Sequence, residues 1–255
     1  SQVRDTLAFT DSIDTVLRNV QPLATPGGSP CGYTSAGLAE GGIPISLLGD
    51  SWRETMVNEG DFSATAVFWD AIWHLTDRLN WTVGLRYTHD SKDFSWFNGP
   101  REAPGLDASL AALQAAGFFA TFPIPPEAYQ FDVVFALPPE LEGTEVRRSD
   151  SWEDVSPRFV IDYEVRPDVM VFGSLAKGYK AGGYNSVEVG SQFDNEDVWN
   201  LEAGVKSVFA RVGLAFNASA YYYEYDDQQS IALVPGENGS GVPQYLMDTS
   251  DVEAF

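Results

Sequence analysis

The chain has 255 residues and carries 37 Asp and Glu against 15 Lys and Arg, a formal net charge of −22, which repels nucleic-acid phosphates and excludes nucleic acid as a partner. Cys31 is the single cysteine, so an internal disulfide and a thiolate metal cluster are excluded as well. No run approaches the ~18 to 20 apolar residues that a membrane-spanning helix needs, although strands that cross a membrane leave no such run.

Residues 63–88 alternate between apolar and polar side chains with a period of two, as a β-strand with two different faces does. The alternation is interrupted by a turn at Thr76-Asp77-Arg78-Leu79 and then resumes. Its apolar positions are Val67, Trp69, Ala71, Trp73, Leu75, Trp81, Val83, Leu85 and Tyr87. The pattern predicts one β-hairpin with a short turn.

Two further hairpins follow the same pattern. Residues 155–163 alternate and turn at Arg166-Pro167-Asp168 into residues 169–184, whose two faces the sequence leaves open. Residues 199–206 pair in the same way with Val212 to Tyr222 across a turn near Arg211. Residues 231–234 and 245–255 are expected to form the sides of the next loop.

The connections between these strands differ in length. Long loops are expected at 97–147, with a helix-like stretch at 107–116, and at 186–196 and 235–243, whereas the turns near Asp77, Pro167 and Arg211 are short. Residues 1–50 are interpreted as another loop. Outer-membrane barrels have short periplasmic turns and long extracellular loops. The fold class predicted is therefore all-β, an antiparallel up-and-down transmembrane β-barrel segment that forms part of a barrel.

The alternation also predicts which side chains face lipid and which face an aqueous lumen, because neighbouring residues of a strand point to opposite faces. The predicted lumen-facing residues are Arg86, Asp90, Arg158, Asp162, Glu202 and Lys206. The predicted lipid-facing or aromatic-girdle residues are Trp69, Trp73, Trp81, Leu85, Tyr87 and Tyr163. Tyr221 and Tyr223 alternate with the outward set, and a lumen-facing position is left open for them.

Three stretches resemble the TonB-dependent receptors of the outer membrane. Residues 66–88 resemble the family's strand that ends in Leu-Thr-Asp and returns as Gly-Leu-Arg-Tyr. Residues 155–158 and 174–185 are similar to its Ser-Pro-Arg and Lys-Gly-Tyr-Lys hairpin, and residues 199–206 resemble its Glu-x-Gly-x-Lys strand. The resemblance covers residues 51–255, and the whole of 1–255 is assigned to one barrel domain.

The resemblance implies a monomeric, plugged barrel in the outer membrane of a Gram-negative bacterium, surrounded by its lipid. It implies import of a ferric siderophore or a similar scarce nutrient, with energy from the TonB-ExbB-ExbD complex acting through a plug. No plug domain or TonB box is recognisable in these residues, so this piece is not expected to close or transport alone. The sequence leaves open which ligand is imported.

No catalytic site or cofactor is expected, because the sequence contains neither a nucleophile-base motif nor a phosphate-binding loop. His74 and His89 lie on adjacent strands at even and odd positions, so their side chains are expected on opposite faces and a shared metal site is not predicted. Residues 194–197 remain either a plain acidic loop or a cation site. The candidates for ligand contact are Trp96, Phe97, Arg101, Tyr129 and Tyr184. A passive porin or adhesin barrel and a soluble secreted carbohydrate-binding protein or glycosidase remain the alternatives.

Overall fold

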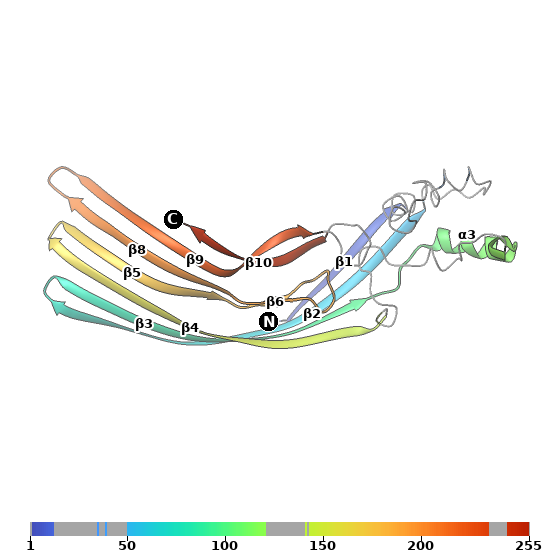
Figure 1. The fold of residues 1–255 in the computed structure, drawn as a ribbon, viewed down its shortest axis with the longest axis horizontal. Coiled ribbons are helices and arrows are strands. Elements are labelled where there is room, and N and C mark those ends of the chain that lie inside the picture. Colours follow the sequence, from blue (N-terminus) through green and yellow to red (C-terminus); the bar gives the residue numbers. More distant parts are fainter. Residues whose placement is uncertain are drawn as a thin grey trace.

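A computed structural model of the chain describes residues 2–12, 50–120, 143–234 and 244–254, together with positions 35, 39 and 141. Eight long strands form one antiparallel sheet in the order β1-β2-β3-β4-β5-β8-β9-β10 (Figure 1). They are β1 (Gln2–Ser12), β2 (Ser51–Thr76), β3 (Leu79–Asn98), β4 (Glu145–Arg166), β5 (Val169–Lys180), β8 (Glu196–Phe209), β9 (Leu214–Val234) and β10 (Gln244–Ala254).

The three predicted hairpins are present as β2–β3, β4–β5 and β8–β9. Their short turns lie together at one end of the sheet, and the long connections lie at the other end (Figure 1). One boundary was predicted wrongly, because Val212 belongs to the third turn and the returning strand begins at Leu214. Gly213 has a φ of 66°, a left-handed conformation that glycine adopts without the steric penalty of a side chain, so the chain reverses there.

The expectation that residues 1–50 form only a loop is wrong for the first part of the chain. Gln2–Ser12 form β1, which pairs with β2 from Gln2↔Asp61 to Ser12↔Ser51. The alternation predicts a strand that begins at Ser63, whereas β2 begins at Ser51. The additional length gives β2 an edge whose backbone N–H and C=O groups need partners, and β1 supplies them.

Smaller elements lie at the long-loop end. The helix α3 (Pro104–Ala115) is followed by the 3-10 helix η1 (Phe118–Ala120), close to the helix-like stretch that the sequence predicts. The loop after β5 contains a second, two-stranded sheet made of β6 (Gly183–Tyr184) and β7 (Gln192–Phe193). Strands β9 and β10 continue the main sheet where the sequence indicated only the sides of a loop.

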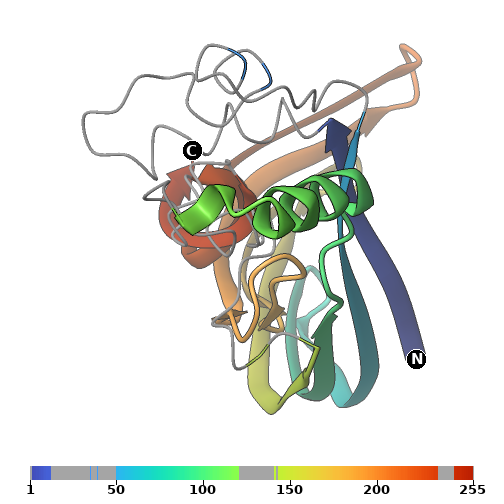
Figure 2. The same cartoon turned by 90° about the vertical axis from the view of Figure 1, so that its right-hand side faces the viewer.

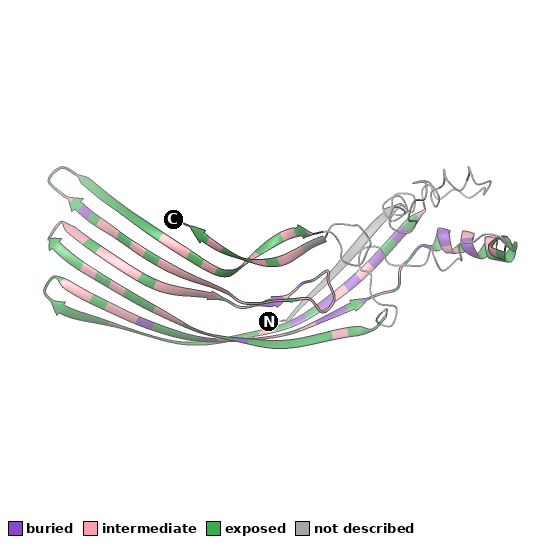
Figure 3. Cartoon of the chain, in the orientation of Figure 1, coloured by how far each residue is buried: buried purple, intermediate pink, exposed green. Residues whose placement is uncertain are grey.

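The sheet curls into an open trough, as the end view in Figure 2 shows. The buried apolar side chains gather at its long-loop end, where Trp52, Met56 and Trp96 are covered and α3 contributes Leu106 and Leu110 (Figure 3). The rest of the sheet leaves large apolar side chains exposed. Within the described residues, no helix has both the length and the apolar character needed to cross a membrane.

Candidate functional site

Strand register divides the side chains of the sheet into two faces, because directly paired residues of antiparallel strands point to the same side. We call the face that carries Trp52, Met56 and Trp96 the inner face, and the opposite one the outer face. The six residues predicted to face the lumen lie on the inner face. The six predicted to face lipid lie on the outer face.

The outer face carries an apolar band that crosses the sheet near the short turns. One of its rows joins six paired residues on six strands: Ala71, Val83, Phe159, Leu175, Leu201 and Tyr222. The rows beside it contain the Trp73–Trp81 and Trp69–Leu85 pairs. Val67 is 69% exposed and Trp69 is 54% exposed, so nothing within the described chain covers this band.

The band has a defined height on β3. It begins with Leu79 beside the first turn and ends with Tyr87, nine residues that span about 27 Å at ~3.4 Å per residue. The next outward row is Thr65, His89 and Glu153, and the row beyond it is Ser63, Ser91 and Ser151. The outer face therefore changes from apolar to polar at one level across β2, β3 and β4.

At the level of the apolar band, the inner face is more polar than the outer face. Asn80 donates a hydrogen bond to Asp162 at 2.7 Å, Arg86 donates to Thr88 at 3.1 Å, and the ammonium of Lys206 lies 5.0 Å from the ring centre of Phe172. Charged and amide side chains of this kind are compatible with a wet surface and would be costly to bury in a dry core. Phe68 is also on this face, opposite Arg86, and is 71% exposed.

The register decides two facings that the sequence left open. Val171 pairs with Tyr163 and with Val205, so it belongs to the outer face, and Met170 and Phe172 belong to the inner face. On β9, Tyr221 pairs with Glu202, which places Tyr221 and its alternating neighbour Tyr223 on the inner face. The two rings lie 5.0 Å apart between centres.

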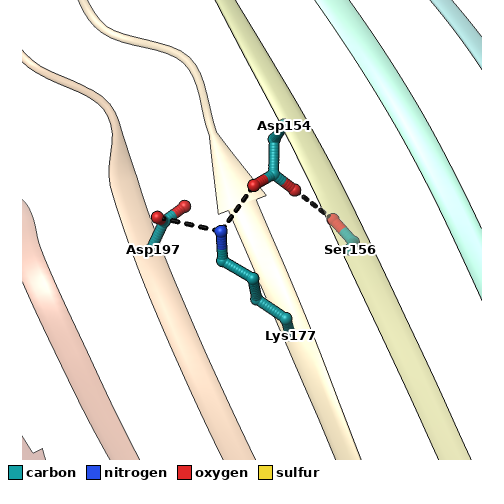
Figure 4. Close-up of polar contacts among 4 residues, drawn as sticks. All are labelled: Asp154, Ser156, Lys177 and Asp197. Carbon is teal, nitrogen blue, oxygen red and sulfur yellow. Dashed lines mark hydrogen bonds and ion pairs between the residues drawn. The ribbon is translucent and has the colours of Figure 1, made fainter.

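A buried charge network connects three strands. The Lys177 ammonium on β5 lies 2.5 Å from Asp154 on β4 and 3.0 Å from Asp197 on β8 (Figure 4). The second carboxylate oxygen of Asp154 accepts a hydrogen bond from the Ser156 hydroxyl. The Asp154 side chain is 5% exposed and that of Lys177 is 16% exposed, so bulk water screens this pairing little.

An aromatic cluster lies on the inner face nearer the long loops. Phe94, Trp96, Trp152 and Tyr184 contact one another, with Trp96 at 90° to the ring of Tyr184. The ammonium of Lys92 lies 5.5 Å from the ring centre of Trp152 and donates a hydrogen bond to the carbonyl oxygen of Gly182. Burial at this position lowers the pKa of Lys92.

Residues 181–193, which we call the inner segment, fold over this cluster. Trp96 donates its indole N–H to the carbonyl oxygen of Asn185, and Asn58 donates to that of Ser186. On its other side, the Asn185 amide oxygen accepts a hydrogen bond of 2.7 Å from the backbone N–H of Met247 on β10. The inner segment therefore joins β2 and β3 to β10 across the inner face.

Of the five candidate ligand contacts, the four within the described residues are not gathered in one site. Trp96 is fully buried under the inner segment, Tyr184 is half-buried within that segment, and Phe97 is exposed on the outer face. The Arg101 guanidinium lies 2.6 Å from Asp107 and stacks over Trp52, which attaches the start of α3 to β2. Tyr129 lies outside the described residues. Lys92 and Trp152 were not predicted from the sequence as part of a site, although each lies between two polar neighbours in its strand.

The described part of the chain holds no group of three or more His, Cys, Asp or Glu side chains arranged for a metal ion. His74 contacts Asn80, whereas His89 lies 3.2 Å from Glu153 on the other face. In the acidic stretch 194–197, Glu196 lies 3.6 Å from Lys180 and Asp197 pairs with Lys177. The positive charges of Lys180 and Lys177 thus offset the negative charges of these two carboxylates.

A hollow of about 370 Å³ lies at the opposite end, between the turns of the β2–β3 and β4–β5 hairpins. Its wall includes Asp162 and Glu164, together with Arg78, Arg166 and Lys206. Charges of both signs surround the hollow, so its lining does not select a cation or an anion by net charge.

A curled antiparallel sheet with short turns at one end, an exposed apolar band outside and polar side chains inside defines the wall of a membrane β-barrel. The family model described as TonB dependent receptor-like, beta-barrel matches residues 17–249. The chain belongs to this family, which consists of receptors and not of enzymes.

Among solved structures, the chain is similar to the ferric yersiniabactin uptake receptor FyuA from Yersinia pestis. The two share 19% sequence identity with a TM-score of 0.45, and the match covers 70% of this chain. It covers 26% of the FyuA chain, so the present chain corresponds to about a quarter of that receptor's length.

Proposed function

We propose that this chain forms part of the wall of an outer-membrane uptake receptor in a Gram-negative bacterium. Its outer face would contact lipid, its inner face would line the aqueous interior, and its short turns would lie in the periplasm. The observation that supports this most strongly is the apolar band, which is about nine residues high on β3 and ends at the row of Thr65, His89 and Glu153. A tilted strand needs about 9 to 11 residues to cross a bilayer.

The same band argues against a soluble secreted protein. A soluble sandwich buries its apolar face against a second sheet about 10 Å away. Here Val67, Ile161 and Leu201 are each at least half exposed, and no described element packs against them. Their exposure to water across six strands would favour aggregation, whereas contact with hydrocarbon removes the cost.

We further propose that the complete receptor takes up a ferric siderophore or a similar scarce chelate, using energy from a TonB-ExbB-ExbD complex. Membership of the family supports this assignment. The partners required would be outer-membrane lipid, a plug domain, the energy-transducing complex and the chelate.

Uptake measurements on cells that carry the full-length gene product test this proposal. Cells with and without the gene are supplied with radiolabelled iron bound to individual siderophores. We expect accumulation of one chelate that requires both the gene and an intact TonB protein. Accumulation that requires the gene but persists without TonB would instead identify a passive porin. If the gene increases the uptake of none of the chelates, iron transport is contradicted.

A further inference from the structure

The backbone pairing between β4 and β5 stops partway along β4. It ends at Arg158↔Ala176, yet β4 continues to pair with β3 as far as Glu145, and β5 continues to pair with β8 as far as Lys180. The next residue of β4 is Pro157, which has no backbone N–H to donate and interrupts a ladder of hydrogen bonds. We call the region beyond this point, where β4 and β5 separate, the seam (Figure 1).

Lys177 lies at the beginning of the seam. It is the first residue of β5 beyond the last paired one, and its ammonium contacts carboxylates on the strands at both sides (Figure 4). Charged hydrogen bonds are about twice as strong as neutral ones, and these are largely shielded from solvent. Lys177 therefore supplies a connection between β4 and β5 at the point where the backbone supplies none.

The inner segment begins four residues after Lys177, so the seam also determines where that segment leaves the sheet. Its polar contacts with the far side of the seam include the Gln192 amide, which donates to Asp150 at 2.6 Å, and Lys92, which donates to Gly182, in addition to the bonds from Trp96 and Asn58. Gly182 lies directly against the indole of Trp152 on β4. A widening of the seam would displace these contacts together.

We propose that Lys177 is a positioning residue that closes the seam and so holds the inner segment over the aromatic cluster. Breaking its ion pairs opens the seam and releases residues 181–193 with Tyr184, which uncovers Trp96 and Trp152 on the inner face. The inner segment is thus a cover that is attached to the sheet through the end of β5 at Lys180. This inference concerns the conformation of the wall and does not depend on which ligand the receptor imports.

Hydrogen-deuterium exchange on the full-length protein in detergent tests the proposal. We expect Lys177→Met to accelerate amide exchange at least tenfold in residues 179–193 and to leave residues 160–166, which stay paired, unchanged. Lys177→Arg should restore exchange to within about threefold of the wild type, because arginine can reach both carboxylates. The matched control is Lys206→Met, which removes an inner-face lysine of β8 far from the seam and should leave the inner segment unchanged.

Two results would overturn the proposal. The first is wild-type exchange in residues 179–193 of Lys177→Met, or acceleration that extends equally to residues 160–166. The second is recovery of the wild-type rate in the double variant Asp154→Asn with Lys177→Met, because Lys177 would then only neutralise a buried carboxylate. If Lys177→Met does not fold, Asp154→Asn removes the pair that crosses the seam, and a change confined to residues 179–193 is again required.

Discussion

Trp96 and Asn185 are joined by a hydrogen bond of 2.7 Å from the indole N–H to the backbone carbonyl oxygen, although 89 residues separate them in the chain. Trp96 is fully buried, and Asn185 is buried as well. Trp96 was a candidate ligand contact in the sequence, and in the structure it supports the inner segment. It also provides a direct way to measure how firmly that segment is held.

Trp96→Phe should loosen the inner segment, because the buried carbonyl oxygen of Asn185 loses its donor at a cost of about 1 to 3 kcal/mol. Cleavage after Glu188 by a glutamate-specific protease reports how often the inner segment opens. If opening and closing are fast relative to cleavage, a loss of about 1 to 3 kcal/mol corresponds to roughly 5-fold to 150-fold faster cleavage. Trp69→Phe, on the exposed outer face, is the control and should leave cleavage at the wild-type rate. Equal cleavage of all three proteins would show that the hydrogen bond does not hold the segment.

Leu85→Arg should impair insertion into lipid vesicles. Leu85 lies within the outer apolar band, and a lipid-facing Arg costs about 2 to 4 kcal/mol near the bilayer midplane. Thr82→Arg on the inner face should have a smaller effect, because that side would meet water. Urea titration of the vesicle-inserted protein measures both free energies. Losses of the same size for the two variants would contradict the assignment of the faces.

Gly182→Ala should destabilise the inner segment by steric conflict. A Cβ at this position would lie 2.4 Å from the carbonyl oxygen of Phe193 and 2.5 Å from the indole nitrogen of Trp152. Overpacking of this kind typically costs about 1 to 3 kcal/mol. Gly173→Ala is the matched control, since its nearest neighbours would be at 3.7 Å and 4.0 Å. Tryptophan fluorescence during urea unfolding measures the difference, and equal stability of both variants would argue against close packing at Gly182.

Tyr184 should ionise at a higher pH than an ordinary tyrosine. Burial raises its pKa, and the nearby carboxylates of Asp150 and Asp93 raise it further. Because the raised pKa belongs to the folded state, the stability that Tyr184 contributes is fully present below about pH 10 and is lost as the pH rises through the folded-state pKa. Ultraviolet titration of the wild type minus Tyr184→Phe isolates this group. If the difference between the two titration curves has its midpoint at or below pH 10, the prediction is refuted.

The hairpins and the division into two faces could be predicted from the sequence. Alternation is a local property, because successive side chains of any strand point to opposite sides, so Trp69 and Leu85 were assigned to one face and Arg86 and Arg158 to the other. The short turn at Arg166-Pro167-Asp168 was equally local, because Pro167 acts through its own backbone. The family-like phrases around these turns added to the same assignment.

Which residues come together was decided by the tertiary structure. The pairing of β1 with β2, the seam beside Pro157 and the contacts of Lys92 with Gly182 and of Trp96 with Asn185 join residues far apart in the chain. Alternation assigns a side chain to a face but does not select its partner across the sheet. That selection depends on strand length, register and the path of the loops, which are set only when the whole sheet has formed.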